Sequence, residues 1–227
     1  MRRAVARLRA IRGLADLSGH WGSAGLHASV SPSSTARLWR QVRIGRRVVV
    51  DPGTHFHTND NGAGYRIFID DDSFVGRYCF FSAGESLYIG RYCNIGAACQ
   101  LLAAGHIYND PRQPYILAPV VSYGHMRLGP NTWVGAGSTL VGGIQVGFGS
   151  ILAAGSLLNI SLPPLCLAAG HPARIIKCFD LAKGEWYRLP IDEPARTEAL
   201  NLHIASLPDE ATYIQQLKVV CLHLEEL

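Results

Sequence analysis

A histidine that opens a long irregular segment is the first residue in this sequence to suggest chemistry. Tyr108 and Asp110 follow His106 almost immediately. A neutral imidazole, whose ordinary pKa is about 6.5, can take a proton from a hydroxyl group near neutral pH. A lone histidine in a loop is more often a solvated or hydrogen-bonded bystander. The elements that position His106 must therefore decide its role.

Those elements follow a period of six residues. An aliphatic residue stands at every sixth position from Leu128 to Leu158, and a small residue follows it in four of the six cases. Neither the helical period nor the strand period produces this spacing. Three six-residue segments would form one triangular coil, and stacked coils would bury a shared interior. The sequence therefore predicts an all-β solenoid of parallel strands.

The six-residue ladder is looser before that run. It begins at Ile44-Gly45, resumes at Ile69 and slips by two residues before Ile89, as insertions in the turns would cause. The longest interruption spans 103–127 and contains three prolines. Because proline donates no ladder hydrogen bond, we expect an extended loop there rather than strands. Long loops on rigid scaffolds concentrate function.

Both ends of the chain depart from the ladder. We expect 1–43 to be an irregular or partly helical lead-in, 44–178 to be the β domain, and 179–227 to be a helical extension. The lead-in carries five arginines in its first twelve residues. A basic helix there could touch an anionic surface, although a solvated helix at the domain edge is the simpler interpretation.

A helix is expected near the C-terminus. Pro163-Pro164 ends the ladder, and Ser206-x-x-Asp209 resembles the start of a helix. Apolar residues then recur at helical spacing, at Tyr213, Leu217, Val220 and Leu224. We therefore predict an amphipathic α-helix over 207–226, with its apolar stripe packed on the solenoid or on a neighbouring subunit.

Composition limits the class of protein. The 227 residues are 48% hydrophobic and 17% charged and include 24 glycines, which indicates one turn-rich β domain. A net charge of +4 is modest, and we expect no nucleic-acid partner. No apolar run approaches the roughly 18 residues of a membrane span, and the N-terminus lacks the pattern of a secretory signal. We expect no stable membrane insertion and a cytoplasmic location.

The cysteines follow the same repeat. Cys79, Cys93 and Cys99 each stand four residues after a ladder aliphatic, a position that holds serine or threonine in later repeats. The sequence contains no C-x-x-C pair. We therefore predict small buried thiols, a reducing compartment and no metal site. Glu85 stands in the corresponding position after Phe81, where either the turn is distorted or the carboxylate faces the site and orients His106 or an acceptor hydroxyl.

Three stretches resemble the hexapeptide-repeat acyltransferases, most closely the galactoside, maltose and capsular-polysaccharide O-acetyltransferases. They are Ile89–His106 (IGRYCNIGAACQLLAAGH), Gly129–Gly137 (GPNTWVGAG) and Ala168–Lys177 (AAGHPARIIK). The resemblance covers residues 69–178. It implies a left-handed parallel β-helix, a homotrimer with active sites between neighbouring solenoids, and acyl transfer from acetyl-coenzyme A.

The resemblance makes His106 the catalytic base. A thioester is already activated, so a positioned acceptor can attack it directly, without a covalent enzyme intermediate. A backbone N–H of Gly135 or Gly143 could stabilise the developing oxyanion. Trp133 becomes a wall of the acceptor or thioester site, the alternative being a surface aromatic that covers a repeat edge.

Further residues could contact the acceptor. Beside Trp133, the candidates are Glu85, Tyr108 and Asp110, each with a plain surface role as the alternative. His125 at the end of the loop is a weaker candidate. A final group, His55, His57 and Asn59, lies in a region that helps form the acceptor pocket in the family.

Coenzyme A is expected in a groove between adjacent solenoids. Small residues would let its pantetheine arm approach the backbone, at Ala136, Ala153, Ala154 and Gly170. Arg174 and Lys177 would meet its phosphates, or form a solvated basic end. The chain departs from the family at Asn159-Ile160, where relatives often carry Thr-Lys. One phosphate contact is then lost or is taken by Arg174, Lys177 or His171.

These observations predict an O-acetyltransferase that acts on a saccharide hydroxyl of the cell envelope or of a capsular or exopolysaccharide. Three alternatives stay open. The acceptor could be a small non-sugar hydroxyl of a xenobiotic or antibiotic. The same scaffold supports a γ-type zinc carbonic anhydrase, although the metal of that enzyme needs three imidazoles and the long loop offers only His106 and His125. The chain could also be a β-helix that assembles without chemistry.

Overall fold

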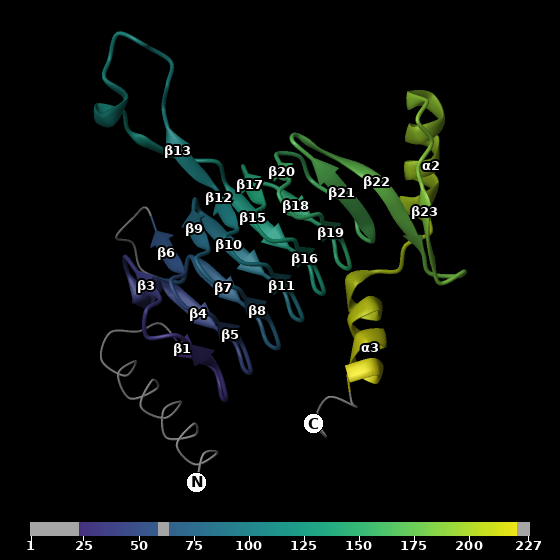
Figure 1. The fold of residues 1–227 in the computed structure, drawn as a ribbon, viewed down its shortest axis with the longest axis horizontal. Coiled ribbons are helices and arrows are strands. Elements are labelled where there is room, and N and C mark those ends of the chain that lie inside the picture. Colours follow the sequence, from purple (N-terminus) through teal and green to yellow (C-terminus); the bar gives the residue numbers. More distant parts are fainter. Residues whose placement is uncertain (1–22, 59–63, 222–227) are drawn as a thin grey trace.

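The computed structural model describes residues 23–58 and 64–221, with side chains as far as Leu217. Figure 1 shows flat turns of chain stacked on one another, with helices at one side. Three sheets, here called A, B and C, enclose a common interior, and each full turn of the coil adds one strand to each sheet. The coil is mostly β, with parallel pairing throughout the body of each sheet.

The strands are short, and their order follows the coil. Sheet A contains β1 (Ser23–Ala24), β4 (Val42–Ile44), β7 (Ile67–Ile69), β10 (Ser86–Ile89), β15 (His125–Leu128) and β18 (Gln145–Val146). Sheet B contains β2 (Ser29–Val30), β5 (Val49–Val50), β8 (Phe74–Val75), β11 (Asn94–Ile95), β16 (Trp133–Val134), β19 (Ile151–Leu152) and β21 (Cys166–Gly170). Sheet C contains β3 (Thr35–Ala36), β6 (His55–Thr58), β9 (Phe80–Ala83), β12 (Gln100–Leu102), β17 (Thr139–Val141) and β20 (Leu157–Leu158).

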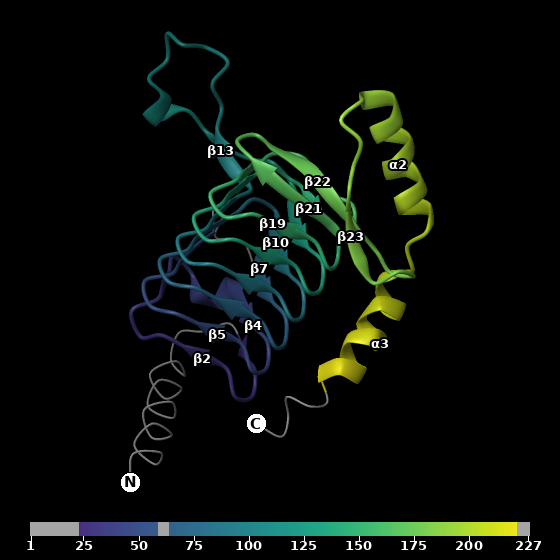
Figure 2. The same cartoon turned by 45° about the vertical axis from the view of Figure 1, so that its right-hand side comes forward.

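The turns between sheets form three edges, which we name by the sheets they join. The A–B edge includes turns 45–48, 70–73 and 90–93. The B–C edge includes 96–99, 135–138 and 153–156. The C–A edge includes 84–85, 103–124 and 142–144. The view in Figure 2 shows the turns of these edges piled in register.

The six-residue ladder is the core of the coil, as predicted. Every aliphatic of the regular run is at most 2% exposed, from Leu128 to Leu158. Ladder residues of successive coils lie opposite one another, so Ile69, Ile89 and Leu128 form one column. The two extra residues before Ile89 therefore do not move the ladder residues out of register.

The coil begins about one turn earlier than the sequence predicted. Strands β1, β2 and β3 occupy 23–36, inside the expected irregular lead-in, and pair in parallel with the next turn. The ladder positions there are Ala24, Val30 and Ala36. Two alanines in three positions weaken the hydrophobic signal, which is why the expectation of a lead-in was wrong for 23–43. The predicted basic helix at 1–12 lies outside the described residues.

The coil also continues past Leu158. Leu162 bridges to Val146 in parallel, and β21 pairs in parallel with β19. Pro163 and Pro164 lie between these two contacts, at a corner where no ladder N–H is needed. Sheet B then turns antiparallel through β22 (Ala173–Asp180) and β23 (Glu185–Arg188).

Two helices close the described chain. The sequence analysis missed α2 (Glu193–Ala205), although its start has clear signals: the Asp192 carboxylate accepts from the Ala195 N–H and a proline stands in the first turn. The predicted tail helix exists as α3 (Glu210–Cys221). Its cap is Asp209, which accepts from the Thr212 N–H at 2.7 Å. Ser206 instead bonds the His203 carbonyl at the end of α2.

Helix α3 packs on the coil through its predicted apolar stripe. The Tyr213 ring stacks on Phe148 with centroids 4.5 Å apart, and its hydroxyl accepts from Asn131 at 2.6 Å. Leu217 joins the same small cluster. Arg127 forms an ion pair with Glu210 at the first turn of the helix. The coil therefore buries the part of this stripe that is described, and the side chains of Val220 and Leu224 lie outside the described residues.

Candidate active site

The long interruption of the ladder forms an arm, residues 103–124, that leaves the coil at the C–A edge. In Figure 1 it extends away from the body of the molecule beyond β12. Contrary to expectation it contains two strands, β13 (Ala104–His106) and β14 (Val120–Ser122), paired antiparallel. The three prolines fall outside both strands, so they do not prevent the pairing. A short 3-10 turn, Tyr115–Leu117, lies near the tip.

His106 is the last residue of β13 and is exposed. Its Nδ1 lies 2.9 Å from the carbonyl oxygen of Ala118, across the arm. Because a carbonyl only accepts, Nδ1 must carry the hydrogen of this bond. The remaining nitrogen, Nε2, then has a free lone pair. The arm thus holds the neutral imidazole as the tautomer that a general base requires.

The base of the arm is tightly packed around Gly84. A Cβ added to Gly84 would overlap the Ala103 carbonyl oxygen and would lie 2.9 Å from the Gly124 carbonyl oxygen. The Tyr123 N–H also donates to the Ala103 carbonyl at 2.8 Å. Only glycine fits such approaches. The position of His106 is therefore tied to the turn at Gly84.

Glu85 does not contact His106. Its carboxylate pairs with His125 Nε2 at 2.9 Å, and Ser86 Oγ lies 2.8 Å from Nδ1 of the same imidazole. The Glu85 side chain is 57% exposed, so it does not occupy the inward position that serine and cysteine take in other repeats. Residue 85 belongs to the C–A edge, where the chain turns early toward β10. The distorted turn is the alternative that the structure favours.

The other predicted arm residues lie outside the coil. Tyr108 is 74% exposed. Asp110 accepts from its near neighbour Arg112 in a two-bond pair at 2.8 and 2.9 Å. The hydrogen bonds from Arg112 lower the pKa of Asp110. Asp110 thus holds a turn of the arm, a role that the local Asp-Pro-Arg sequence could have indicated.

Trp133 lies on β16 in sheet B, a different face of the coil from the arm. Its ring is half-exposed and borders a hollow of about 280 Å³ beside α3. The hollow is mainly aromatic and apolar, and its other lining residues are Asn131, Gly149, Ile151, Leu165, Phe179, Trp186 and Tyr213. In Figure 1 the arm and α3 lie on opposite sides of the coil. Within one chain, therefore, Trp133 and His106 are not brought together.

The small residues predicted to admit coenzyme A gather at the B–C edge. Ala136 and Ala154 are exposed there in successive turns, and the Gly155 N–H donates to the Ala136 carbonyl. Ala153 is half-buried beside them, and its N–H donates to the Ala168 carbonyl. Together they form a column that presents backbone and methyl groups to solvent.

The predicted basic residues extend this column onto the terminal hairpin. Arg174 is exposed and stands opposite Ala169, one residue before Gly170. Lys177 is half-buried opposite Leu167. Arg174 thus lies at the B–C edge, whereas Lys177 stands in the same cross-strand column of sheet B as Trp133, Ile151 and Leu167. Like Trp133, this column lies away from the arm of its own chain.

The two possible oxyanion donors differ in their surroundings. The Gly135 N–H donates to the Leu152 carbonyl at 2.7 Å, so it is committed to the ladder. Gly143 belongs to the C–A edge, and a Cβ added there would lie 3.5 Å from the His125 carbonyl oxygen. Of the two, Gly143 is the one beside the base of the arm.

The two histidines of β6 lie on sheet C, two strands from β12. The His55 ring stacks on Phe80 with centroids 5.6 Å apart, and its Nδ1 lies 2.7 Å from Thr35 Oγ1. Burial and then the neighbouring His57 lower the pKa of His55. Asn59, the third member of the predicted group, lies outside the described residues.

The cysteines behave as predicted from their positions. Cys79, Cys93 and Cys99 are at most 1% exposed, as are the threonine and the first two serines that replace them in later repeats. All five cysteines whose side chains are described are free thiols. The pKa of Cys93 is raised to about 12 by burial. These thiols fill the interior of the coil.

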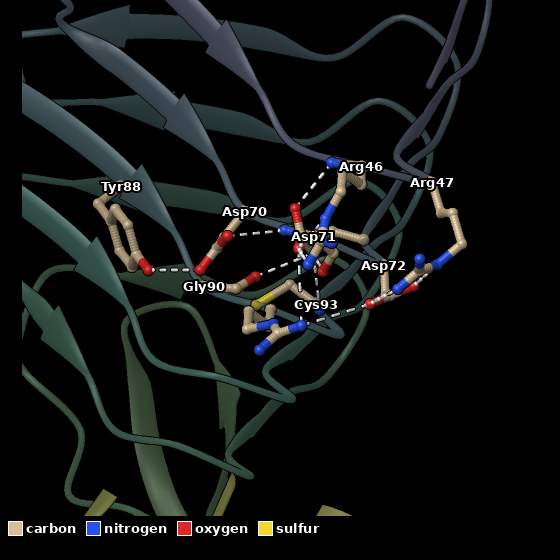
Figure 3. A network of polar contacts seen from close by, with 10 residues as sticks. Arg46, Arg47, Asp70, Asp71, Asp72, Tyr88, Gly90 and Cys93 are labelled. Carbon is tan, nitrogen blue, oxygen red and sulfur yellow. Dashed lines mark hydrogen bonds and ion pairs between the residues drawn. The ribbon is translucent and has the colours of Figure 1, made fainter. Parts of the chain in front are cut away.

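The A–B edge holds a charge network that the sequence analysis missed. Figure 3 shows its arginines and aspartates meeting across three turns. Arg46 Nη2 lies 2.7 Å and Arg91 Nη2 lies 3.6 Å from Asp71 Oδ2. The Tyr88 hydroxyl donates to Asp70 at 2.9 Å. Charged pairs at equivalent positions of successive repeats, 46–47 and 71–72, were the available signal.

Burial and hydrogen bonding oppose each other at Asp71. Burial acts to raise the pKa of this carboxyl group, but the hydrogen bonds from the side chain and backbone of Arg46 outweigh it, so the pKa is lowered. The carboxylate is therefore the form that the fold stabilises. Its partners all belong to the coil, so this network is structural.

The chain is similar to curated acetyltransferases over part of its length. It is 29% identical over 123 residues to the putative acetyltransferase SAV2555 of Staphylococcus aureus, covering 53% of this chain and 59% of the relative. It is 26% identical over 143 residues to the probable acetyltransferase Rv3034c of Mycobacterium tuberculosis, covering 60% of this chain and 44% of the relative. The chain thus spans less than two thirds of these relatives. No protein-family model matches it.

Solved structures share the fold. A mutant of AntD, an N-acyltransferase from Bacillus cereus in complex with dTDP-4-amino-4,6-dideoxyglucose and coenzyme A, superposes with a TM-score of 0.60 at 20% identity, covering 83% of this chain and 93% of that one. The hexapeptide-repeat-containing acetyltransferase VCA0836 from Vibrio cholerae superposes with a TM-score of 0.52 at 21% identity, covering 74% and 80%. The chain therefore shares its fold with these two acyltransferases. No helix among the described residues is long and apolar enough to span a membrane.

Proposed function

We propose that this chain transfers an acetyl group from acetyl-coenzyme A to a hydroxyl group of a saccharide. The observation that carries the proposal is the His106–Ala118 hydrogen bond, which leaves Nε2 free at the end of β13. Nε2 takes the proton of the acceptor hydroxyl as its oxygen attacks the thioester carbonyl. The C–S bond then breaks, and coenzyme A leaves as the thiol with the proton from the imidazolium. Acetyl ester and free coenzyme A are the products.

The acyl donor is proposed to lie along the B–C edge. Ala136, Ala153, Ala154 and Gly170 leave room for the pantetheine arm, and Arg174 and Lys177 face its phosphates. Because that edge and Trp133 lie away from the arm of the same chain, a complete site needs a second copy. This supports the homotrimer of left-handed hexapeptide-repeat solenoids that the sequence resemblance implies, with each arm reaching a neighbouring coil. Acceptor contacts from Trp133, Glu85 and Tyr108 and a cytoplasmic location complete the proposal.

A second candidate is transfer to an amino group of a nucleotide-linked sugar. The likeness to AntD, whose structure contains such a sugar, favours testing it. The two reactions differ in their need for a base, because a hydroxyl must lose its proton during attack whereas a neutral amine attacks without prior help. A free imidazole in the arm therefore favours the hydroxyl acceptor.

The test is thiol release from acetyl-coenzyme A by the full chain, measured against a panel of acceptors. The panel contains neutral hexoses, cell-envelope and capsular oligosaccharides, a small alcohol antibiotic and a dTDP-linked amino sugar. We expect release that depends on a sugar hydroxyl, with an ester found in the product by mass spectrometry. Release with the amino sugar alone would establish the second candidate, and no acceptor-dependent release would overturn both. Sedimentation of the same sample tests the trimer.

A further inference from the structure

Three metal-binding side chains meet beneath the last turn of sheet B, far from the arm in the fold. They are Cys166 on β21, Cys178 on β22 and His203 on α2. Their ligand atoms all lie within 4.8 Å of one another. The two cysteines are 0% exposed and His203 is 4% exposed. Nothing in the proposed transfer reaction uses this cluster.

The distance between the sulfurs suits metal coordination. Cys166 and Cys178 stand directly opposite each other on antiparallel strands, and their Sγ atoms lie 3.6 Å apart. A disulfide needs about 2.05 Å. Two thiolates on one tetrahedral zinc ion, each about 2.3 Å from the metal, lie about 3.8 Å apart. The observed spacing is therefore close to that of a shared metal.

The surroundings supply the outer contacts that metal ligands require. His203 Nε2 lies 2.9 Å from the Pro164 carbonyl oxygen, a bond that orients the ring. Tyr187 stands directly opposite Cys178 on β23, and its hydroxyl is hydrogen-bonded to the Cys178 sulfur. Outer contacts thus hold both the imidazole and one of the thiols in place.

We propose that Cys166, Cys178 and His203 bind a thiophilic divalent cation, Zn²⁺, as a structural site. Two thiolates and one neutral imidazole fill three positions of a tetrahedral ion, the fourth is left for water, and the two thiol protons leave to solvent on binding. The ion ties the terminal hairpin to α2, adding to the packing of Ala199 and Leu200 against the core. The sequence analysis expected no metal because the three ligands lie on three separate elements and match no short spacing pattern.

The experiment is a titration of the reduced full chain with Co²⁺, followed by competition with Zn²⁺. Cobalt reports its ligands through thiolate charge-transfer absorption in the near ultraviolet and intense visible bands of a tetrahedral ion. We expect one equivalent of Co²⁺ per chain with both signals, displaced by Zn²⁺. Absence of the charge-transfer band in the reduced protein would overturn the proposal, as would a Cys166–Cys178 disulfide forming in place of binding.

Variants locate the ligands. Cys178→Ser and His203→Gln should each lower Zn²⁺ affinity by more than the 10–100-fold that outer contacts contribute, and Tyr187→Phe should lower it by about 10-fold. Cys99→Ser is the matched control, because Cys99 is an equally buried thiol inside the coil, away from the cluster. The Cys99→Ser variant should bind Zn²⁺ as tightly as the unaltered chain does. Equal loss in Cys99→Ser, or undiminished affinity in folded His203→Gln, contradicts the assignment.

Discussion

The A–B and C–A edges are turns of the same coil, yet they use their polar residues in opposite ways. At the A–B edge, arginines and aspartates of successive turns pair with one another, as Arg46 and Asp71 do (Figure 3). At the C–A edge the chain leaves the stack to form the arm, and polar groups such as Glu85 and His106 remain exposed. One edge satisfies its charges internally. The other carries exposed polar groups, each paired locally but still open to solvent.

This difference shows where a repeat fold can carry chemistry. A ladder of paired charges stabilises the stacking of turns but leaves no group free to react. A turn that is extended into an arm loses stacking contacts with neighbouring turns, but its residues extend beyond the coil. The rest of the coil holds the base of the arm in place. We therefore expect changes at the A–B edge to alter stability without altering catalysis, and changes at the C–A edge to alter catalysis.

The largest expected effect on stability lies in the core that both edges share. Phe81 is fully buried under sheet C, with its ring 5.4 Å from that of Phe56. Phe81→Ala should lower the free energy of unfolding by about 3–5 kcal/mol, because it leaves a cavity. Urea denaturation measures this. Phe74→Ala is the control, since Phe74 is 39% exposed, and an equal loss there would contradict the assigned core.

Substitutions at two glycines, one at each edge, test the two edges separately. A Cβ on Gly45 would lie 2.7 Å from the Asp71 amide nitrogen, and a Cβ on Gly84 would lie 2.6 Å from Ser122 Oγ in the arm. Each alanine variant should lose about 1–3 kcal/mol of stability through overpacking. Only Gly84→Ala should also lower kcat, because it displaces the base of the arm. If Gly45→Ala lowered kcat of the folded protein equally, the division between edges would be wrong.

The smallest expected loss of stability comes from changing one residue of the charge network. Asp71→Asn should cost about 0.5–1 kcal/mol at neutral pH, since its partner Arg46 is largely exposed and solvent weakens the pair. The folded pKa of Asp71 is lowered. Its stabilisation is therefore complete above the unfolded value of about 3.9 and is lost as pH falls through the lower folded value. Urea midpoints of the two proteins should converge as the pH falls below the folded pKa of Asp71, and a difference that persisted in strong acid would refute the ionic origin.

The sequence predicted the coil wherever large aliphatics stood at six-residue spacing, as at Leu128 and Val134. It missed the first turn because Ala24 and Ala36 carry too little hydrophobic signal. The strands of the arm escaped notice because β13 and β14 are three residues long and pair with each other across the loop. Local spacing does not encode such pairing.

The candidate site was only partly predictable. A histidine at the start of the long interruption was visible, but the hydrogen bond that sets its tautomer comes from Ala118, twelve residues away. The family resemblance also assigned Trp133 to the site of His106, whereas within one chain the coil puts them on different faces. Which faces meet depends on assembly, and a single sequence does not specify the geometry of an assembly.

The most direct test of the central claim is the rate of coenzyme A release by His106→Ala with a hydroxyl acceptor that the unaltered chain uses. The account predicts a kcat lower by about 10²–10⁴-fold, the range expected for loss of a general base. It also predicts an unchanged urea midpoint, because the His106 side chain lies outside the core. Asp71→Asn, assayed beside it, should keep the full kcat. An unchanged kcat in folded His106→Ala would contradict the account.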